Sequence, residues 1–571
     1  MTEEKKKDIP YNMRLLAEGK MDKLMGAGFA VSMGANARKG RVVDISADST
    51  GTVQTVKLCD SKWYDVYMAD HMTGDMGRYS AARLFPTRRA ALESRDSIYK
   101  AKPKPKRPDS RVAGAAGKPE SEAAPRLSDE ELRNRSIWPL ELAGKLSPDQ
   151  LSILKEIWST ACPIRSLLEN DLYKFSMAQF VLHRYPRCYV RVEFKNRNTD
   201  EPLGYLAPII DKWLNTLCKL RFTEDEIIWL RLNIPWLSSD FIDYLQRFYM
   251  FRQQIEVSVD SKGELVIVAE GPWRDVIWFE VPVLAMVAEA RARLKFMQLS
   301  EDEQKTALQQ REERLTAKIR TLNYLRKAHP FTLSEFGLRR RSSAYWEDIA
   351  VERFANDGGR FFTGTSNVYL AKKFGLRPSG TMAHELFMGM QGVGINLRDV
   401  QREVWRQWMD EYRGKNGIML TDPFGAMQCM KDLDWYTATS FGGFRHDSGC
   451  PFAWGELFLD RLKELEVKHS DEKTFVWSNN LNLNDICDIT PRFSHRVQVG
   501  YGWGTGIVHD LAPVIPANIV MKVTRSNNQD VLKLPDAEGK QQCRNNELIE
   551  YTKRVYDWKP LPTYGKDGQA I

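Results

Sequence analysis

The chain of 571 residues has few cysteines and no long hydrophobic run, and these absences exclude several classes of protein. None of its eight cysteines forms a CxxC pair, which argues against a zinc ribbon or a thioredoxin-like site. Scattered single thiols are typical of a reducing compartment. Residues 1–10 are charged and lack the apolar core of a signal peptide, and the most apolar run, 276–288, is interrupted by Glu280 and Pro282. Because a membrane-spanning helix needs about 20 apolar residues, we expect a cytoplasmic protein without a membrane segment.

The chain also lacks a large excess of charge of either sign. The 83 Lys and Arg residues face 75 Asp and Glu residues, so the net charge is only +8. A small positive excess suits an enzyme for anionic substrates as well as it suits a nucleic-acid binder. The 16 tryptophans, in contrast, indicate a large packed core.

Residues 1–98 are predicted to form a small β-barrel module with a polar N-terminal tail. Alternation of polar and β-branched or aromatic residues predicts strands at 39–45, 52–58 and 63–67, which resemble an SH3- or Tudor-like barrel. Such a module could bind a peptide or nucleic acid, or could only dock and mediate assembly. A Tudor-type aromatic cage would need convergent aromatic rings, but period-two alternation places Trp63 and Tyr67 on one face and Tyr64 on the other.

Residues 99–130 are predicted to be a disordered linker, because their Lys-Pro run and Ala/Gly/Pro/Ser stretch cannot bury enough apolar surface to fold. Residues 131–571 have the pattern of a catalytic region. Helical periodicity covers 171–184, 223–233 and 283–326, and short apolar strands follow at 417–421, 474–478, 496–499 and 519–523. This alternation predicts a mixed α/β domain over about 131–330 and an α/β barrel with a parallel sheet over about 331–571.

Four glycine-bearing segments are expected to be loops that follow strands: 364–366, 379–381, 445–449 and 500–506. In an α/β barrel, the loops at the carboxyl ends of the strands build the active site. Glycine lets the backbone approach an anion closely, and exposed N–H groups can bind phosphate. A single loop of this kind is usually a plain turn, but four of them interleaved with Arg, His and Asp indicate a phosphate-binding site.

Six ordered motifs resemble the nicotinate phosphoribosyltransferase family, over about 164–556. They are DLYKFSM (171–177), FGLRRR (336–341), GTSNV (364–368), GTMAHE (380–385), RHDSG (445–449) and GYGWGTG (500–506). The resemblance implies an irregular α/β barrel beside a mixed α/β domain, with homodimers that share their sites. It also implies a reaction in which nicotinate displaces pyrophosphate from phosphoribosyl pyrophosphate, with Mg²⁺ present and ATP hydrolysis coupled to product formation.

His384 and Asp422 are the residues that the resemblance makes catalytic. His384 follows a Gly-Thr turn at a predicted helix start, where the helix dipole favours an anionic group. The family resemblance implies that ATP phosphorylates this histidine. Asp422 would hold the imidazole, because a carboxylate on one ring nitrogen fixes the tautomer and leaves the other nitrogen nucleophilic. A plain role for Asp422 as a turn residue at a strand end stays open.

The resemblance also implies the binding residues. Arg445 would bind the nicotinate carboxylate through charge-assisted hydrogen bonds, and Tyr173 would stack on the pyridine ring. Thr381 resembles a second nicotinate contact of that family. For phosphoribosyl pyrophosphate, the implied contacts are Thr505 and Gly504, with Asp447 for ribose hydroxyls or Mg²⁺, and Arg339 and Lys533 as further phosphate contacts.

Ser366 points to nicotinate rather than nicotinamide as the substrate. Relatives that use nicotinamide have Asp at this position, and that carboxylate would repel the carboxylate of nicotinate. An enzyme for quinolinate is a further alternative, but such enzymes are not expected to have a phosphorylatable histidine in this motif.

Four residues depart from the family pattern. Asn479 and Asn482 stand where bacterial members have Asp, Cys450 replaces another Asp, and Gly506 replaces an Arg. Lost acids could weaken metal or ribose binding, and the lost Arg could weaken phosphate binding. A catalytically silent sensor or scaffold is therefore the alternative to an active enzyme.

Overall fold

The computed structural model describes residues 146–198, 200–536, 543 and 545–562, and the backbone of five strands nearer the N-terminus. The chain divides into two compact units, Met1–Pro125 and Arg126–Ile571. The predicted linker over 99–130 lies outside the described residues, so its disorder stays a prediction.

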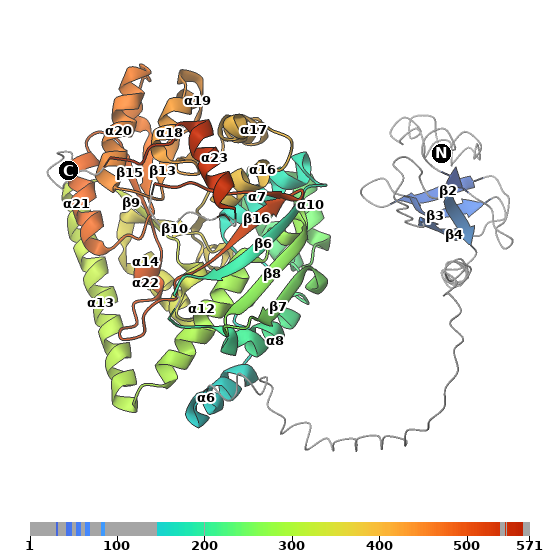
Figure 1. Cartoon of the computed structure of the whole chain (residues 1–571), viewed down its shortest axis with the longest axis horizontal. Helices are drawn as coiled ribbons and strands as arrows, with labels where there is room; N and C mark the ends of the chain where they lie inside the picture. Colours follow the sequence, from blue (N-terminus) through green and yellow to red (C-terminus); the bar gives the residue numbers. More distant parts are fainter. Residues whose placement is uncertain are drawn as a thin grey trace, which may run out of the picture. The chain divides into compact units, whose positions relative to one another are not determined.

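The first unit contains a five-stranded sheet in the order β1-β5-β4-β3-β2. Figure 1 labels β2, β3 and β4 of this sheet. Its strands are β1 (Ala30–Val31), β2 (Val42–Ala47), β3 (Val53–Leu58), β4 (Trp63–Met68) and β5 (Ala81–Phe85). β2, β3, β4 and β5 pair antiparallel in succession, whereas β1 pairs parallel with β5. Strands therefore form near the three predicted positions, and the SH3- or Tudor-like classification stays a prediction.

A seven-stranded parallel sheet dominates the second unit, in the order β11-β10-β9-β15-β14-β13-β12. Its strands are β9 (Thr332–Glu335), β10 (Phe362–Thr365), β11 (Arg377–Pro378), β12 (Ile418–Leu420), β13 (Gly443–His446), β14 (Thr474–Trp477) and β15 (Gln498–Trp503). The sheet curls into a half-barrel that begins with β11 and ends with β12. Because all seven strands are parallel, their carboxyl ends lie at one edge.

A second sheet of five antiparallel strands has the order β17-β16-β6-β8-β7. Its strands are β6 (Tyr189–Asn196), β7 (Ile255–Val259), β8 (Leu265–Pro272), β16 (Ile519–Ser526) and β17 (Gln529–Asp530). The prediction that 519–523 belongs to the parallel sheet is therefore wrong, because β16 pairs antiparallel with β6 (Figure 1). An apolar β-branched strand fits either sheet, and only its tertiary partner decides which one it joins.

Eighteen helices of the described chain surround the two sheets. They are α6 (Pro148–Ser159), α7 (Leu172–Arg184), α8 (Ala207–Leu217), α9 (Glu224–Asn233), α10 (Ser239–Arg247), α11 (Trp273–Val276), α12 (Glu280–Met297), α13 (Glu301–Ala328), α14 (Ala344–Asp357), α15 (Val368–Phe374), α16 (His384–Met390), α17 (Val400–Tyr412), α18 (Ala426–Asp432), α19 (Trp435–Ser440), α20 (Pro451–Glu464), α21 (Leu483–Phe493), α22 (Thr505–Val508) and α23 (Asn546–Tyr556).

The helical pattern predicted over 283–326 forms two helices, α12 and α13. α12 is buried over most of its length, including its charged residues Glu280, Glu289 and Arg291, so it lies inside the core. Ser300 then caps α13, since its side chain accepts from the Glu303 N–H and the Glu303 side chain accepts from the Ser300 N–H. This capping box starts a new helix where the hydrophobic periodicity alone continues.

Several glycines expected in loops lie inside strands. Gly364 belongs to β10, and a Cβ there would lie 1.9 Å from the Arg377 carbonyl oxygen. Gly500 and Gly502 belong to β15, and a Cβ at Gly502 would lie 2.3 Å from the Phe336 ring. These glycines let neighbouring strands and an aromatic ring approach the backbone. The loops begin later, at Ser366 and Gly504.

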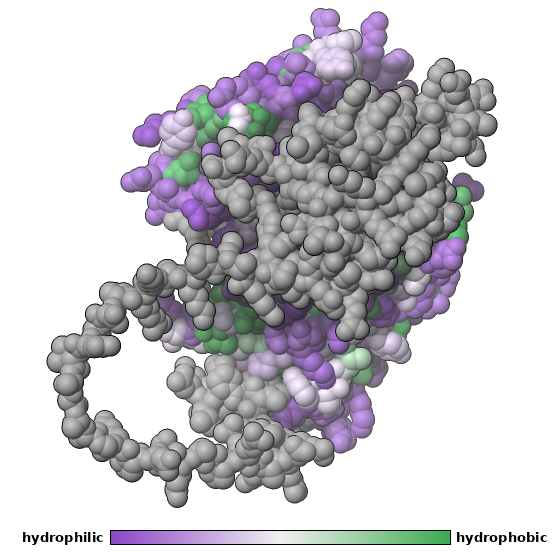
Figure 2. Space-filling model, turned by 90° about the vertical axis from the view of Figure 1, so that its right-hand side faces the viewer, coloured by the Kyte–Doolittle hydropathy of each residue, from purple (hydrophilic) through white to green (hydrophobic). Residues whose placement is uncertain are grey.

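One hydrophobic core extends through both sheets of the second unit. Nine tryptophans of the described residues are fully buried in it, which confirms that the tryptophan content reflects a large core. The part of the surface visible in Figure 2 is mainly hydrophilic, with separate hydrophobic areas. Among the described residues, none of the helices is both long and apolar enough to span a bilayer.

Candidate active site

A pocket of about 870 Å³ opens at the carboxyl edge of the half-barrel. Residues that directly follow five of the parallel strands line it: Phe336 after β9, Ser366 after β10, Asp447 after β13, Ser478 after β14 and Gly504 after β15. The opposite wall comes from β6 and β16 of the antiparallel sheet. The site therefore lies between the two sheets and needs both.

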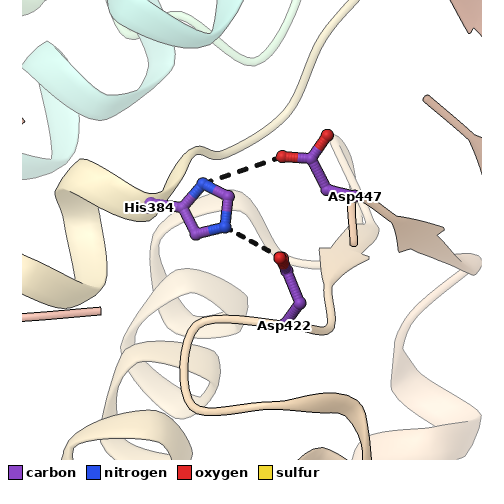
Figure 3. Close-up of side chains that lie close together, drawn as sticks. All are labelled: His384, Asp422 and Asp447. Carbon is purple, nitrogen blue, oxygen red and sulfur yellow. Dashed lines mark hydrogen bonds and ion pairs between the residues drawn. The ribbon is translucent and has the colours of Figure 1, made fainter. Parts of the chain in front are cut away.

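His384 and Asp422 lie together at this edge, as predicted (Figure 3). His384 begins α16, and Asp422 comes two residues after β12. His384 Nε2 is 2.9 Å from Asp422 Oδ1, and Ser448 Oγ donates to Asp422 Oδ2 at 2.7 Å. Asp447 lies on the other side of the imidazole, with Oδ2 3.7 Å from Nδ1. The turn-residue interpretation of Asp422 is therefore insufficient, because both of its oxygens are engaged inside the site.

The electrostatics favour a neutral imidazole. Burial lowers the pKa of His384, and the positive charge of Lys533 adds to this, while Asp422 opposes it. Burial would raise the pKa of Asp422, but His384 and Lys533 hold it well below its usual range. With Asp422 ionised, the Nε2 proton is donated to it, so Nδ1 carries the lone pair. The ring is thus held in a form that can act as a nucleophile.

The predicted nicotinate residues do not all face this pocket. Tyr173, Ser366 and Arg445 line it, whereas Thr381 does not. The Thr381 hydroxyl donates to the Ile418 carbonyl oxygen at 2.7 Å and so joins the β11 side of the half-barrel to β12. Thr381 instead lines a second hollow of about 760 Å³ inside the curled sheet. Its part in binding nicotinate stays a prediction.

Arg445 lies where the two hollows meet, since it lines both of them. One of its nitrogens, Nη1, donates to the Met382 carbonyl oxygen at 3.1 Å, and Nη2 is 3.7 Å from Asp447 Oδ2. Nε is buried and has no hydrogen-bond partner. A buried donor without a partner is costly, so a ligand carboxylate here would satisfy it.

Asp171 is a site residue that the sequence did not single out. The Ser366 hydroxyl donates to Asp171 Oδ1 at 2.7 Å, and Arg339 Nε is 3.3 Å from Asp171 Oδ2. Burial raises the pKa of this carboxyl group, although Arg339 and Ser366 act against that. Asp171 precedes the motif's Tyr173 by two residues, so its position in the DLYKFSM motif was the available signal.

The predicted phosphoribosyl pyrophosphate residues Gly504, Thr505, Asp447 and Arg339 all line the pocket. Gly504 approaches the chain after β9 closely, because a Cβ there would lie 2.7 Å from the Phe336 carbonyl oxygen. Asp447 also accepts from Ser478 Oγ at 3.2 Å.

Further cations that sequence reasoning missed line the same pocket: Lys195, Arg197, Arg340 and Lys522, beside the weaker candidate Lys533. Burial lowers the pKa of Arg340 to about 10, helped by the neighbouring Arg339 and Arg197. Lys195 and Arg197 lie on β6 and just after it, and Lys522 lies on β16, so only the fold brings them here. Clustered cations of this kind favour a polyanionic ligand.

The four departures from the family pattern differ in position. Asn482 caps α21, accepting from the Asp485 N–H at 3.0 Å, and it does not line the pocket. Cys450 precedes α20 and is also outside the lining. Asn479 and Gly506 do line it. A Cβ at Gly506 would lie 2.3 Å from Trp503 Nε1, which donates to the Leu481 carbonyl oxygen, so no larger residue fits without a shift of that ring.

His384, Asp422 and Asp447 also form the group of ligand atoms that could hold a metal ion among the described residues. Both Asp422 oxygens already accept hydrogen bonds, and magnesium prefers oxygen ligands, including substrate phosphates, over imidazole. The donor set therefore fits a histidine–carboxylate pair better than a magnesium cage. Asp447, whose side chain is about a quarter exposed at 27%, is the carboxylate that fits a metal carried by a polyphosphate.

Comparison with known proteins agrees with this geometry. Residues 331–559 match the nicotinate phosphoribosyltransferase (NAPRTase) family model, and residues 168–288 match the model of its N-terminal domain. Nicotinate phosphoribosyltransferase of Acinetobacter baumannii is 38% identical over 70% of this chain and 98% of its own length. That of Chromobacterium violaceum is 38% identical over 69% of this chain and 97% of its own length.

The chain belongs to the nicotinate phosphoribosyltransferase family. The fold agrees: the solved structure of nicotinate phosphoribosyltransferase from Vibrio cholerae superposes with a TM-score of 0.65 at 30% identity, over 72% of this chain and 96% of that one. The structure from Porphyromonas gingivalis gives a TM-score of 0.64 at 30% identity, over 69% of this chain and all of that one. Both family matches lie in the second unit, so they say nothing about residues 1–98.

Proposed function

We propose that this chain is a nicotinate phosphoribosyltransferase that forms nicotinate mononucleotide and pyrophosphate, with ATP hydrolysis coupled through phosphorylation of His384. The observation that carries the proposal is the buried His384–Asp422 pair at the edge of a pocket that also holds Arg445 and a cluster of cations. Family membership supports the transferase activity, and the geometry of the imidazole supports the coupling.

Nicotinate would bind against Arg445 and the aromatic rings of Tyr173 and Phe336, which line the pocket. Its carboxylate would satisfy the buried Arg445 Nε, and the ring would be held with its nitrogen towards the ribose. Orientation of the two reactants supplies much of the rate, because the transition state resembles an oxocarbenium ion and needs little covalent help.

The phosphates would occupy the basic part of the pocket. Gly504, Thr505, Arg339 and Arg340 lie on its half-barrel side, and Lys195 and Arg197 lie on the antiparallel sheet. Magnesium would reach the site with the pyrophosphate group and take Asp447 as its protein ligand, neutralising charge on the leaving group. The fixed cations would stabilise the charge that develops on pyrophosphate as the bond to ribose breaks.

His384 would accept the γ-phosphoryl group of ATP on Nδ1. The N–P bond forms as the bond between the γ-phosphorus and the β,γ-bridging oxygen breaks, and ADP leaves with that oxygen. Asp422 keeps the proton on Nε2 and stabilises the charged ring. Water later hydrolyses the phosphohistidine, which couples ATP consumption to product formation.

The activity is tested by chromatography of products from phosphoribosyl pyrophosphate and Mg²⁺ with nicotinate or nicotinamide, each with and without ATP. We expect nicotinate mononucleotide, formed faster with ATP, and little product from nicotinamide. In His384→Ala we expect the slower ATP-independent reaction to remain and the ATP effect to vanish. An unchanged ATP effect in that variant contradicts the phosphohistidine. No mononucleotide from either base would instead support the silent binding protein.

The resemblance also motivates a homodimer. Light scattering of the purified chain is expected to give twice the 65.8 kDa chain mass, and a monomeric mass would contradict it.

A further inference from the structure

A network of mostly buried charged side chains lies at the wall of the pocket, and Arg339 is the one member that the sequence analysis predicted. Lys174 on α7 is its centre and is fully buried. Its Nζ is 2.7 Å from Glu280 Oε2 on α12, and it also donates to Glu385 on α16. One cation thus joins three helices that are distant in the sequence.

The Glu280 end of the network reaches the substrate pocket. Lys522 Nζ donates to Glu280 Oε1 at 2.8 Å, and Arg339 Nη1 is 3.7 Å from the same oxygen. Arg339 continues to Asp171 and through it to Ser366. The pocket is lined by Lys522, Glu280, Arg339, Asp171 and Ser366, whereas Lys174 and Glu385 lie outside its lining.

The Glu385 end reaches the phosphate acceptor. Glu385 follows His384 directly in the first turn of α16, and its Oε1 accepts from Trp273 Nε1 at 2.9 Å. Lys174 is therefore the link between the helix that carries His384 and the carboxylate that holds Arg339 and Lys522.

The charges in the network balance, which explains how they tolerate burial. Lys174, Lys522 and Arg339 face Glu280, Glu385 and Asp171. Burial would raise the pKa of Glu280, but Lys174, Lys522 and Arg339 hold it well below its usual range. Burial would lower the pKa of Lys174, but Glu280 and Glu385 hold it above its usual value. Removal of one partner would leave an uncompensated buried charge.

We propose that Lys174 is a positioning residue that transmits the phosphorylation state of His384, through Glu385 and Glu280, to Arg339 and Lys522 in the substrate pocket. This inference rests on the proposed ATP coupling. A phosphoryl group on His384 adds negative charge one residue from Glu385. A shift of Lys174 between Glu385 and Glu280 then changes the charge that Glu280 presents to the two pocket cations.

Thermodynamic linkage relates phosphorylation of His384 to the affinity for substrate. If phosphorylation of His384 changes the affinity for substrate, the coupling must pass through groups whose arrangement differs between the two states. In the described chain, Lys174 contacts carboxylates on both sides of this path. A purely structural ion pair would affect stability in both states equally and leave the ATP effect unchanged.

The test uses the full chain with Lys174→Gln, which keeps a hydrogen-bond donor and removes the charge. Labelling of His384 by [γ-³²P]ATP is measured beside the KM for nicotinate and for phosphoribosyl pyrophosphate, each with and without ATP. We expect labelling to persist, the ATP-independent kcat to remain, and the ATP-dependent change in KM to shrink by at least about fivefold. Full labelling with an unchanged ATP effect on KM overturns the proposal, as does loss of labelling.

A second variant covers the case in which Lys174→Gln does not fold. Glu385→Gln removes the charge at the other contact of Lys174 and keeps an oxygen for the Trp273 N–H. It should show the same loss of the ATP effect with labelling retained.

Arg291→Gln is the matched control. Arg291 is a buried cation, as Lys174 is, and it lies on α12, but it pairs with Glu201 and the Ile515 carbonyl oxygen instead of the network. This control should lose stability without loss of the ATP effect, and an equal loss in the control overturns the proposal.

The His384→Ala variant distinguishes failure of the proposed ATP coupling from failure of the transmission through Lys174. If it abolishes the ATP effect while Lys174→Gln keeps it, the phosphohistidine stands and the transmission through Lys174 is wrong. If His384→Ala itself keeps the ATP effect, the proposed coupling is wrong, and the inference falls with it.

Discussion

At the scale of single residues, the site depends on how each polar group is engaged. One oxygen of Asp422 contacts His384 and the other accepts a hydrogen bond from Ser448. Asp422 therefore holds the imidazole in place and is not a free carboxylate. The Ser366 hydroxyl donates a hydrogen bond to Asp171, a contact that the sequence analysis did not foresee. Ser366 and Asp171, which belong to two different motifs of the family, are therefore hydrogen-bonded to each other without a substrate.

Asp422→Asn should lower the ATP-coupled rate by about 10²- to 10⁴-fold, since the amide can present its N–H to the ring and so favour the wrong tautomer. The ATP-independent rate should change little. Rates with and without ATP measure both, and a parallel loss of both would contradict the specific role of Asp422.

The pH dependence of the coupled reaction follows from the same pair. Burial lowers the pKa of His384 below its ordinary value of 6.5, so more than half of the imidazole is neutral and nucleophilic at pH 6.5. ATP-dependent labelling should therefore persist at pH 6.5 and fall only at more acidic pH, as the ring becomes protonated. Labelling that is half lost at pH 6.5 would show that the pKa is unshifted.

Ser366→Asp should raise the KM for nicotinate by about tenfold or more, because two carboxylates would then face the substrate carboxylate and each other. Ser366→Asn has nearly the same shape without the charge and serves as the control. The comparison of KM values in the two variants isolates the charge. Equal effects in both would assign the loss to shape or to the broken bond with Asp171.

At the scale of elements, the parallel sheet explains why distant motifs meet. Five of the six motifs lie at or just after the end of a strand, and these strands are parallel, so their carboxyl ends lie at one edge of the sheet. The sequence predicted this grouping from the glycine-bearing segments, although it placed Gly364 and Gly500 in loops and they lie in strands. The reason is that glycine allows close approach inside a sheet as well as in a turn.

Asn482→Ala should destabilise the protein by about 1 kcal/mol, because α21 loses its cap. Asn482→Asp should be almost neutral, since both side chains cap helices well. Urea unfolding measures the two changes, and the KM for phosphoribosyl pyrophosphate should be unaffected in both. A changed KM with unchanged stability would show that Asn482 acts in substrate binding and not as a helix cap.

At the scale of the whole molecule, the antiparallel sheet ties the two halves of the second unit together. β16 comes after every strand of the half-barrel, yet it pairs with β6, more than 300 positions earlier in the chain. The pocket lies between the two sheets, and β6 and β16 supply part of its basic lining, with Lys195 and Lys522. Neither half can therefore build the site alone.

Residues 126–571, expressed alone, should unfold cooperatively, whereas residues 331–571 should not fold, because β16 would lack its β6 partner. Circular dichroism during thermal unfolding distinguishes the two. A cooperative transition in the shorter fragment would show that the predicted barrel region is an independent domain.

The amino-acid sequence alone was enough to predict the family, because its six ordered motifs are local residue patterns, and the family resemblance then implied the pairing of His384 with Asp422. It did not determine the sheet of β16, the Asp171–Ser366 bond or the cations Lys195, Arg197 and Lys522 in the pocket wall. Each of these joins segments that are distant in the chain. Hydrophobic period and propensity describe only near neighbours, so the burial that brings such segments together decided them.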